Sequence, residues 1–412
     1  MSITRRVFLR NGALAVVGTT AIPGFLARAA YGAIESGTRT RRLVVIFQRG
    51  AADGLNIVVP HGEPSYYAMR PSINIPRDKV IDLDGLFGLH PALASFQPLW
   101  NQRHLAIVHA AGSPDPTRSH FDAQDFMESG TPGIKATEDG WLNRTLSGLP
   151  PSIANSAFRA IAMGPSLPRA LAGPEPAVAV NDITQFGVGG RNSTPVANTF
   201  EAMYEQSVDA VLHGSGQETF DAVKMLKSAD PARYKPAAAA NYPNGRFADS
   251  LRQLAQMIKA NLGVQVAFAD IGGWDHHVNE GSTQGQIANV LREFSQSLSA
   301  FWIDLGDLAE DTVIVTMSEF GRTARENGNR GTDHGHANVM FVMGGPVKGG
   351  RVYGRWPGLD QSQLYEGRDL ALTTDFRRVL GEAVEVHLGN RNLSQVFPDF
   401  SNQPESFLRF LA

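Results

Sequence analysis

The sequence predicts an α/β fold in which a mainly parallel sheet is covered by helices on both faces. Apolar runs rich in β-branched residues predict buried strands at 42–48, 104–110, 264–272, 311–321 (with its turn) and 338–346. Helical patterns are found between or after these runs at 90–102, 119–129, 245–263, 284–308 and 373–388. Strands that alternate with amphipathic helices are typical of parallel sheets with both faces buried.

The middle of the chain follows this pattern less clearly. Residues 131–195 are rich in Pro, Gly and Asn and predict loops with small strands, such as the apolar run 158–164. Two helical stretches follow at 196–213 and 216–228. We therefore expect one α/β domain over 40–412, in which 131–240 is an insertion or cap region.

Composition limits the functional classes. The 412 residues are 42% hydrophobic and 19% charged, which is ordinary for a globular protein. No basic stripe is present, so the sequence gives no reason to expect a nucleic-acid partner. Because there are no cysteines, thiolate metal ligands and a cysteine nucleophile are excluded.

The first thirty residues have the pattern of an export signal. "TRRVFLR" is followed by the apolar run "GALAVVGTTAIPGFL" and by small residues at Ala27, Ala29 and Ala30. The pair Arg5–Arg6 resembles a twin-arginine signal, which implies the twin-arginine translocase as a partner and a periplasmic or extracellular location. The alternative is a membrane anchor, but the apolar run is shorter than the roughly 20 residues that a spanning helix needs.

Acidic residues and histidines follow several of the predicted strands. In parallel sheets, ligand sites lie outside the carboxyl ends of strands, so we expect these side chains to gather at one edge. The residues concerned are Asp53, Ser119, His120, Asp275, His276, His277, Glu319, Arg322, Asp333, His334 and His336.

This set of side chains points to metal-assisted ester hydrolysis. Mixed histidine and carboxylate ligands suit zinc, manganese or iron better than calcium. Ser119 begins a predicted helix, whose N-terminal N–H groups favour an oxyanion. Arg118 or Arg322 could hold the same anion. No dinucleotide fingerprint or phosphate-binding loop follows any strand.

Each residue also has an ordinary structural interpretation. Ser119 could only cap its helix, and Asp53 could only cap an Asp-Gly turn. Glu319 could form an ion pair with Arg322, and His276 could face solvent. The joint occurrence of such residues after successive strands favours the metal site, and the two histidines of "TDHGH" (332–336) are the strongest single piece.

Several longer segments resemble the bacterial DUF1501 family. They are "VVIFQRGAADGLNIVVP", "RSHFDAQDFMESG", "GGWDHH" and "TMSEFGRTARENGNRGTDHGHANVMFVMGG", together with the twin-arginine start. The resemblance that they carry extends over nearly the whole mature chain. That family is similar to the alkaline phosphatase, phosphoglycerate mutase and sulfatase superfamily. The resemblance implies a three-layer α/β/α sandwich, a two-metal site and a nucleophile at a helix N-terminus.

The resemblance also implies roles for single residues. Ser119 matches the nucleophile position, and His120 or Arg322 would hold the non-bridging oxygens of the ester. The implied metal ligands are Asp53, Asp275, His277, Glu319 and His334, with His336 or Asp333 as an extra ligand. The implied cofactor is one or two divalent ions, zinc first, with manganese or calcium as alternatives.

Two departures from the superfamily pattern matter. Phe320 stands where the superfamily has a ligand histidine, so a second metal would lose a donor. Pro114 stands four positions before Arg118, where sulfatases of the formylglycine type have Cys or Ser.

The expected function is therefore an exported metal-dependent hydrolase of a phosphate or sulfate ester on a small molecule or glycan. A non-catalytic envelope binding protein on the same fold is the main alternative. An exported redox enzyme is a third, which the export signal alone suggests.

Overall fold

The structure is a computed structural model that describes residues 40–150, 156, 158–183, 234–401 and 404–411. The expected export signal at 1–30 and the two expected helices at 196–213 and 216–228 lie outside the described residues. Over the described ranges, no helix has both the length and the apolar character needed to cross a membrane.

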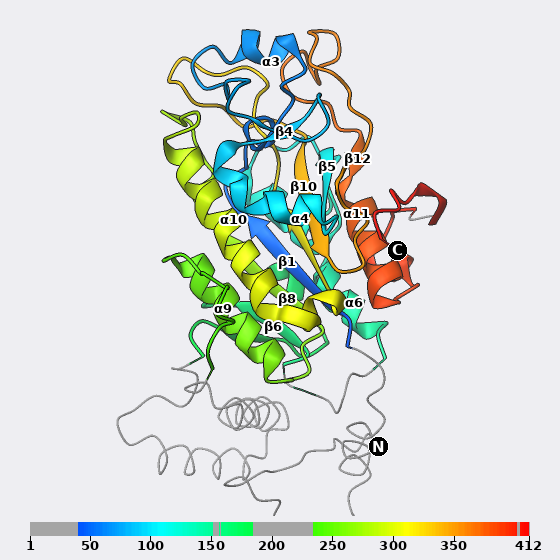
Figure 1. The fold of residues 1–412 in the computed structure, drawn as a ribbon. Coiled ribbons are helices and arrows are strands. Elements are labelled where there is room, and N and C mark those ends of the chain that lie inside the picture. The colour runs from blue at the N-terminus through cyan, green and yellow to red at the C-terminus, as the bar shows by residue number, and fades with distance from the viewer. Residues whose placement is uncertain (1–39, 151–155, 157, 184–233, 402–403, 412) are drawn as a thin grey trace, which may run out of the picture.

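A nine-stranded sheet forms the centre of the molecule (Figure 1). Its strand order is β11-β5-β10-β9-β1-β8-β6-β7, and β12 pairs with β5. The strands are β1 (Arg42–Gln48), β5 (Leu105–Gly112), β6 (Ala160–Met163), β7 (Val178–Val180), β8 (Val266–Ile271), β9 (Thr312–Met317), β10 (Asn338–Gly344), β11 (Arg351–Tyr353) and β12 (Thr374–Asp375). Among these strands β10 alone pairs antiparallel, with both β9 and β5. The predicted mainly parallel sheet is therefore confirmed.

Helices cover both faces of this sheet. One face carries η1 (Pro91–Phe96), α4 (Gln97–Asn101), α9 (Arg246–Lys259) and α10 (Gln286–Leu305), and η4 (Gly306–Asp311) follows α10. The other carries α5 (His120–Ser129), α6 (Trp141–Ser147), η2 (Arg169–Leu171), α11 (Phe376–Glu382), η5 (Ala383–Leu388) and α12 (Leu393–Val396). In Figure 1, α9 and α10 lie on one side of β1 and α11 on the other, which gives the expected three layers.

The central strand β1 shows why the sheet is buried on both faces. Val44 and Ile46 point into the core beneath α9 and α10. Leu43, Val45 and Phe47 point into the core beneath α6 and α11. Successive side chains of a strand point to opposite faces, so an unbroken apolar run can serve two cores at once.

An aromatic cluster joins α10 to the sheet and to the segment after β8. The ring of Phe294 on α10 lies 5.7 Å from Phe96, 6.1 Å from Phe341 and 5.8 Å from Trp274, measured between ring centroids. Burying one such side chain stabilises the fold by about 1.5–3 kcal/mol. The cluster therefore holds Trp274, and with it the "GGWDHH" loop, against the end of the sheet.

A small antiparallel sheet lies over the carboxyl end of β1, near α3 at the top of Figure 1. Its strands are β2 (Val58–Val59), β3 (Ile81–Asp82) and β4 (Gly88–Leu89), and two short helices, α2 (Gly54–Ile57) and α3 (Pro64–Met69), accompany it. The sequence analysis did not predict these elements. Two-residue strands are too short for an alternating pattern to be recognised.

Two other expectations need correction. The helix expected at 90–102 is a 3₁₀ segment followed by the short α4, because Pro98 lies within it and cannot donate the N–H that a continuous α-helix would need there. The helix expected at 373–388 begins only at Phe376 and continues as a π-helical segment, η5. A last 3₁₀ turn, η6 (Pro404–Ser406), lies close to the chain end.

Part of the expected insertion at 131–240 belongs to the central sheet. β6 and β7 lie within the expected insertion at 131–240, yet β6 pairs with the central strand β8 and β7 extends the sheet beyond it. This described part of the region is therefore one edge of the central sheet, and residues 184–233 lie outside the described residues.

Candidate metal centre

The candidate site lies where β1, β8, β9 and β5 end and where β10 begins. Because β10 is antiparallel to its neighbours, its first residue, Asn338, lies opposite Ala111 near the end of β5. The loop before β10 therefore comes to the same edge as the loops after the parallel strands. This is why His334, which precedes a strand, lies beside residues that follow strands.

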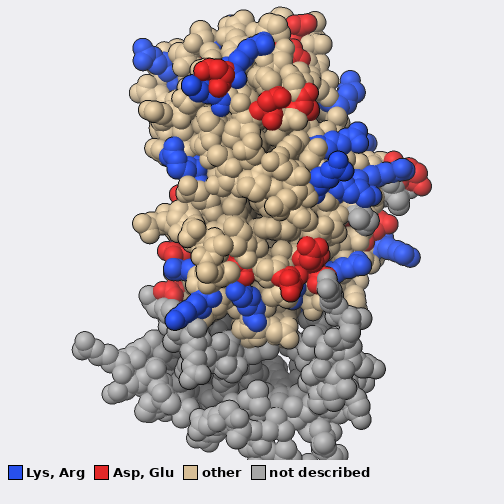
Figure 2. Space-filling model, viewed as in Figure 1, with Lys and Arg blue, Asp and Glu red and all other residues tan. Residues whose placement is uncertain are grey.

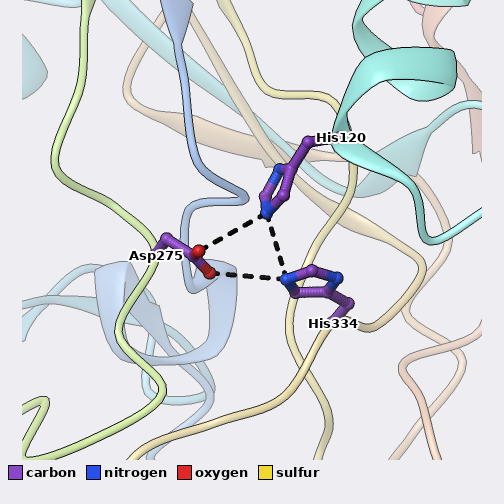
Figure 3. Close-up of side chains that lie close together, drawn as sticks. All are labelled: His120, Asp275 and His334. Carbon is purple, nitrogen blue, oxygen red and sulfur yellow. Dashed lines mark hydrogen bonds and ion pairs between the residues drawn. The ribbon is translucent and has the colours of Figure 1, made fainter.

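Three side chains from separate segments of the chain, His120 at the start of α5 and Asp275 and His334 in loops, converge at this edge (Figure 3). His120 Nε2 lies 3.0 Å from His334 Nε2 and 3.6 Å from Asp275 Oδ2. His334 Nε2 lies 3.4 Å from Asp275 Oδ1. The ligand atoms of these residues all lie within 4.8 Å of one another, so the group could hold a metal ion.

A fourth side chain borders this group. His277 Nε2 lies 3.0 Å from His334 Nε2 and 3.0 Å from Asp275 Oδ1. We call His120, His277, His334 and Asp275 the histidine cluster. The structure thus brings together His120, which the sequence analysis assigned to substrate contact, and three of the expected ligands.

The other ring nitrogen of each histidine is bonded to an oxygen. His120 Nδ1 lies 2.8 Å from Glu319 Oε1, and His334 Nδ1 lies 2.8 Å from the carbonyl oxygen of Arg118. His277 Nδ1 lies 3.2 Å from Asp333 Oδ1. Carbonyl and carboxylate oxygens only accept hydrogen bonds, so Nδ1 carries the proton in each ring. In neutral rings, the Nε2 lone pairs of His120 and His277 then each face that of His334.

Facing lone pairs need a positive centre between them. A proton would satisfy one pair of nitrogens, whereas a metal ion can satisfy the nitrogens of His120 and His334 and the Asp275 carboxylate together. Zinc–nitrogen bonds of about 2.0–2.1 Å in a tetrahedron place the ligand atoms about 3.3–3.4 Å apart. The observed separations of 3.0, 3.4 and 3.6 Å between the ligand atoms of His120, His334 and Asp275 fit that geometry.

The "GGWDHH" loop positions two members of the cluster. Trp274 is 1% exposed, and its Nε1 donates to the carbonyl oxygen of Ile271 over 2.9 Å. Gly50, in the loop after β1, has φ of +120°, and a Cβ there would lie 3.0 Å from the backbone nitrogen of Asp275. Glycine is needed at this close approach. Of the two adjacent histidines, His277 reaches the cluster and His276 is buried outside it.

Glu319 lies behind His120 and not among the converging atoms. Its Oε1 accepts from His120 Nδ1 and also from the Gly50 backbone N–H (2.8 Å) and Gln124 Nε2 (2.9 Å), while Oε2 accepts from Ser318 Oγ (3.0 Å). Burial raises the pKa of Glu319, but these hydrogen bonds outweigh it and hold the pKa below its usual value. The hydrogen bond from His120 makes the largest lowering contribution. Glu319 is therefore an ionised carboxylate that orients the His120 ring, whereas it was expected from the sequence to be a metal ligand.

Arg322 is buried, and its donors are used by groups within the protein. Its side chain is 0% exposed, and its guanidinium donates to the Asp275 carboxylate. The remaining donors reach the backbone carbonyl oxygens of Gly50, Ala51, Trp274 and Thr332. Because the guanidinium is committed to these groups, Arg322 orients Asp275 and is not available to hold an ester oxygen.

Asp275 and His334 have pKa values shifted in the directions that favour metal binding. Burial raises the pKa of Asp275, but the hydrogen bond and charge of Arg322 outweigh it, so its pKa lies below the usual value. Burial lowers the pKa of His334. A metal ligand must be an ionised carboxylate or a neutral imidazole, which both shifts favour.

Ser119 is the N-cap residue of α5, but its side chain makes no capping hydrogen bond. Its hydroxyl is exposed at the start of a ten-residue helix, one position before His120. The neighbouring Arg118 pairs with Glu366 and Asp369, each at 2.7 Å.

Asp53, an expected ligand, lies apart from the histidine cluster. It is 2% exposed and forms an ion pair with Arg70, whose Nη2 donates to Oδ1 over 2.9 Å. Burial raises the pKa of Asp53, but the charge of Arg70 outweighs it and the pKa lies below its usual value. Glu280 lies beside this pair, where burial and the charge of Asp53 raise its pKa well above the usual value. Glu280 therefore holds a proton and Asp53 the negative charge.

Two further residues near the cluster have structural contacts. His336 is 7% exposed and stacks on Tyr365 with ring centroids 4.4 Å apart, outside the group of converging atoms. The Phe320 ring lies 5.0 Å from both His120 and His334, and so forms an apolar wall of the cluster. Gly321 follows it, where a Cβ would lie 1.9 Å from the carbonyl oxygen of Ala337.

The sequence analysis missed Gln124, although a signal was present. Gln124 lies four residues after His120 on α5, so both side chains point to the same face of the helix. Both donate to Glu319 Oε1. Arg70 and Glu280 were missed as well, since no local pattern links them to Asp53.

The family model described as "Protein of unknown function (DUF1501)" matches residues 100–390, which is more than half of the chain. The chain belongs to this family. The resemblance expected from the sequence is thereby confirmed at the level of the family. A search of curated proteins found no match for this DUF1501 chain.

Solved structures with some similarity to the DUF1501 chain include three from bacteria. The zinc complex of the C-terminal periplasmic domain of EcEptC from Escherichia coli is 10% identical, with a TM-score of 0.35 and coverage of 75% of this chain and 74% of that one. The PsFucS1 sulfatase from Pseudoalteromonas is 11% identical, with a TM-score of 0.37 and coverage of 94% and 74%. The alkaline phosphatase from the Antarctic bacterium TAB5 is 10% identical, with a TM-score of 0.29 and coverage of 75% and 93%. At these TM-scores the likenesses carry no conclusion about activity.

Proposed function

We propose that this protein is a metal-dependent hydrolase of a phosphate or sulfate ester. The observation that carries the proposal is the convergence of His120, His334 and Asp275, with His277 beside the last two. Each of the three imidazole rings is held through Nδ1 by an oxygen acceptor. Such outer hydrogen bonds fix the tautomer and orientation of metal-binding histidines. Nothing in the ordinary packing of a polar loop requires this arrangement.

The proposed ligands are His120, His277, His334 and Asp275. Three imidazoles with one carboxylate suit zinc, whereas calcium is bound by oxygen ligands. A divalent cation bound there would polarise an ester oxygen and lower the pKa of a hydroxyl group. Asp53, Glu319 and His336 are not included in this ligand set, because each is engaged with other groups.

Ser119 is the proposed nucleophile. Its hydroxyl is free of a capping bond, and the first N–H groups of α5 have no partner within the helix and favour an anionic oxygen. In the proposed step, a bond forms between Ser119 Oγ and the phosphorus or sulfur atom as the bond to the alcohol oxygen breaks. The serine proton passes to solvent, and the departing alcohol takes a proton from water. A water molecule then releases the phosphate or sulfate and restores the serine.

The test is hydrolysis of 4-nitrophenyl phosphate and 4-nitrophenyl sulfate by the zinc-loaded protein and two variants. Ser119→Ala is expected to lower kcat at least 100-fold while the bound zinc stays unchanged. His334→Ala is expected to lose both zinc and activity. Full activity in Ser119→Ala would remove the serine from the mechanism, and full activity after zinc removal would refute the metal-dependent mechanism.

A non-catalytic binding protein on the same fold is the second candidate. It is favoured by Phe320, whose ring packs against His120 and His334 where a further polar ligand could otherwise stand. A protein that binds zinc and phosphate but hydrolyses neither ester would support this candidate. Under both functions, we propose export by the twin-arginine route after removal of residues 1–30.

A further inference from the structure

The loop that carries His277, residues 276–280, is paired with residues 327–333, which end just before His334. Three backbone hydrogen bonds of 2.9–3.0 Å join the two segments, from Asn279 to Asn329, from Glu280 to Arg330 and from Thr332 to His276. Gly331 fits this pairing, because a Cβ there would lie 2.5 Å from the carbonyl oxygen of His277. Two proposed ligands of the metal therefore belong to segments that are fixed to each other.

Asn327 begins the second segment and uses both ends of its side-chain amide. Its Nδ2 donates to the carbonyl oxygen of His277 over 2.9 Å and to Asp333 Oδ1 over 3.1 Å. Its Oδ1 accepts from the backbone N–H groups of Asn329 (2.8 Å) and Gly331 (3.1 Å). A flipped amide would place oxygen against two acceptors, so these contacts decide which end is the nitrogen. Asn327 thus closes its own loop through Oδ1 and reaches the His277 loop through Nδ2.

The two hydrogen bonds donated by Asn327 hold His277 at two points. One holds the main chain of His277 at its carbonyl oxygen. The other holds Asp333 Oδ1, the atom that lies 3.2 Å from His277 Nδ1. The His277 side chain is 40% exposed, so packing alone restrains its ring little. The direction of the ring therefore depends on these polar contacts.

We propose that Asn327 is a positioning residue of the metal centre, which keeps the His277 ring directed at the metal by holding the His277 carbonyl oxygen and the Asp333 carboxylate. The inference rests on the proposed function, since it takes a metal ion to be bound at the histidine cluster. Asn327 acts through His277 and is not itself a ligand. Losing an outer partner of a metal-binding histidine usually lowers metal affinity by about 10- to 100-fold.

The test separates the donated hydrogen bonds of Asn327 from the accepted ones. Asn327→Asp has nearly the same shape and keeps an oxygen for the N–H groups of Asn329 and Gly331, but it cannot donate to His277 or Asp333. We expect the zinc Kd of the full chain, measured by competition with a chelator, to rise about tenfold. An added negative charge by itself favours a bound cation, so a charge effect would change the Kd in the opposite direction.

Asn329→Asp is the matched control. Asn329 is an exposed asparagine of the same loop, and its contact with Asn327 is made by its backbone N–H, so the substitution adds the same charge and keeps that contact. The loop reaches the end of α3 through the Glu326 N–H, which donates to the carbonyl oxygen of Met69 (3.1 Å). Acidic and basic side chains are already mixed at the α3 end of the face shown in Figure 2. We therefore expect no rise in the zinc Kd of this control.

A double variant tests the link to Asp333 directly. In Asn327→Asp/Asp333→Asn the two side chains exchange their groups, so an amide can again donate to a carboxylate. The zinc Kd is expected to return to within about threefold of that of the unchanged protein, which is the loss expected from Asp333→Asn alone. Cobalt(II) bound in place of zinc reports its ligands through its visible spectrum. That spectrum should change in Asn327→Asp and return toward that of the unchanged protein in the double variant.

The outcomes separate this inference from the proposed hydrolysis. An unchanged zinc Kd or an unchanged cobalt spectrum in Asn327→Asp would overturn the role of Asn327 and leave the metal centre standing. A double variant that binds zinc no better than Asn327→Asp would also overturn it. If the unchanged protein binds no zinc, both the inference and the proposed metal centre fail. A Kd that rises in Asn327→Asp alone and recovers in the double variant supports the inference even in a protein that hydrolyses neither ester.

Discussion

Glu319 lies directly behind His120: its Oε1 is 2.8 Å from Nδ1 of the ring, while Nε2 of the same ring is 3.0 Å from His334 Nε2. The first carboxylate after β9 therefore supports a histidine from the first turn of α5. A carboxylate in this position orients the imidazole and raises its basicity, which strengthens a metal bond made through Nε2.

Glu319→Gln is expected to weaken zinc binding about 10- to 100-fold, which is the usual effect of losing such a support. The amide retains the size of the side chain, so the fold should persist. The measurement is the zinc Kd by competition with a chelator. Glu310→Gln is the control, since Glu310 is an exposed carboxylate in η4, before the start of β9, and should leave the Kd unchanged. An unchanged Kd in Glu319→Gln would contradict the supporting role.

Asp333→Asn should weaken zinc binding less than Glu319→Gln does. The Asp333 side chain is 54% exposed and lies 3.2 Å from His277 Nδ1, so water can replace much of its contribution. Glu319, by contrast, is fully buried and accepts four hydrogen bonds. We expect a change of about threefold or less, measured by the same competition assay. A larger loss of zinc affinity in Asp333→Asn than in Glu319→Gln would show that Asp333 supports the metal centre more than Glu319 does.

Asp53→Asn should affect stability and not metal content. The substitution leaves Arg70 buried without its charged partner, and breaking a buried ion pair costs about 3–5 kcal/mol. Because Glu280 lies beside Asp53 and can take up the negative charge, we expect the free energy of unfolding to fall by about 3 kcal/mol, the lower end of that range. Urea unfolding measures the free energy of unfolding, and elemental analysis measures the zinc bound per chain. Loss of zinc with unchanged stability would restore Asp53 as a ligand.

The sequence predicted where the site lies better than it predicted the role of each residue. Parallel strands end at a common edge, so the position of Asp275 and His277 followed from the strand pattern alone. His334 precedes β10 and reaches the same edge only because β10 is antiparallel, which the sequence did not predict. The sequence did not predict that His120 would join the cluster and Glu319 would support it, because this depends on how the start of α5 packs against the end of β9, two segments far apart in the chain. Pairing over long distances in the chain, such as that of Asp53 with Glu280, leaves no local pattern.

Acid is expected to destabilise the fold through two buried histidines outside the site. In His90 and His109, Nδ1 accepts a backbone N–H and Nε2 donates to a carbonyl oxygen, so both rings must be neutral. Burial lowers the pKa of each to about 4, from 6.5. Between these pH values the unfolded chain binds more protons, so the free energy of unfolding falls as the pH is lowered from about 6.5 to about 4. Each unit of pKa difference is worth about 1.4 kcal/mol.

The double variant His90→Asn/His109→Asn isolates this effect. Asparagine offers an acceptor and a donor but does not titrate in this range, so the variant should be less stable at pH 7 and should depend less on pH. The measurement is urea unfolding of the chelator-treated proteins at pH 7 and pH 5. An identical pH dependence of the two proteins would show that other groups carry the acid sensitivity.

The most direct test of the account is the metal content of the purified protein after zinc loading and removal of free zinc, measured by elemental analysis. We predict one zinc ion per chain in the unchanged protein and in His336→Ala, and none in His334→Ala. A protein that retains no zinc, or zinc that persists in His334→Ala and disappears in His336→Ala, would contradict the histidine cluster as the metal centre.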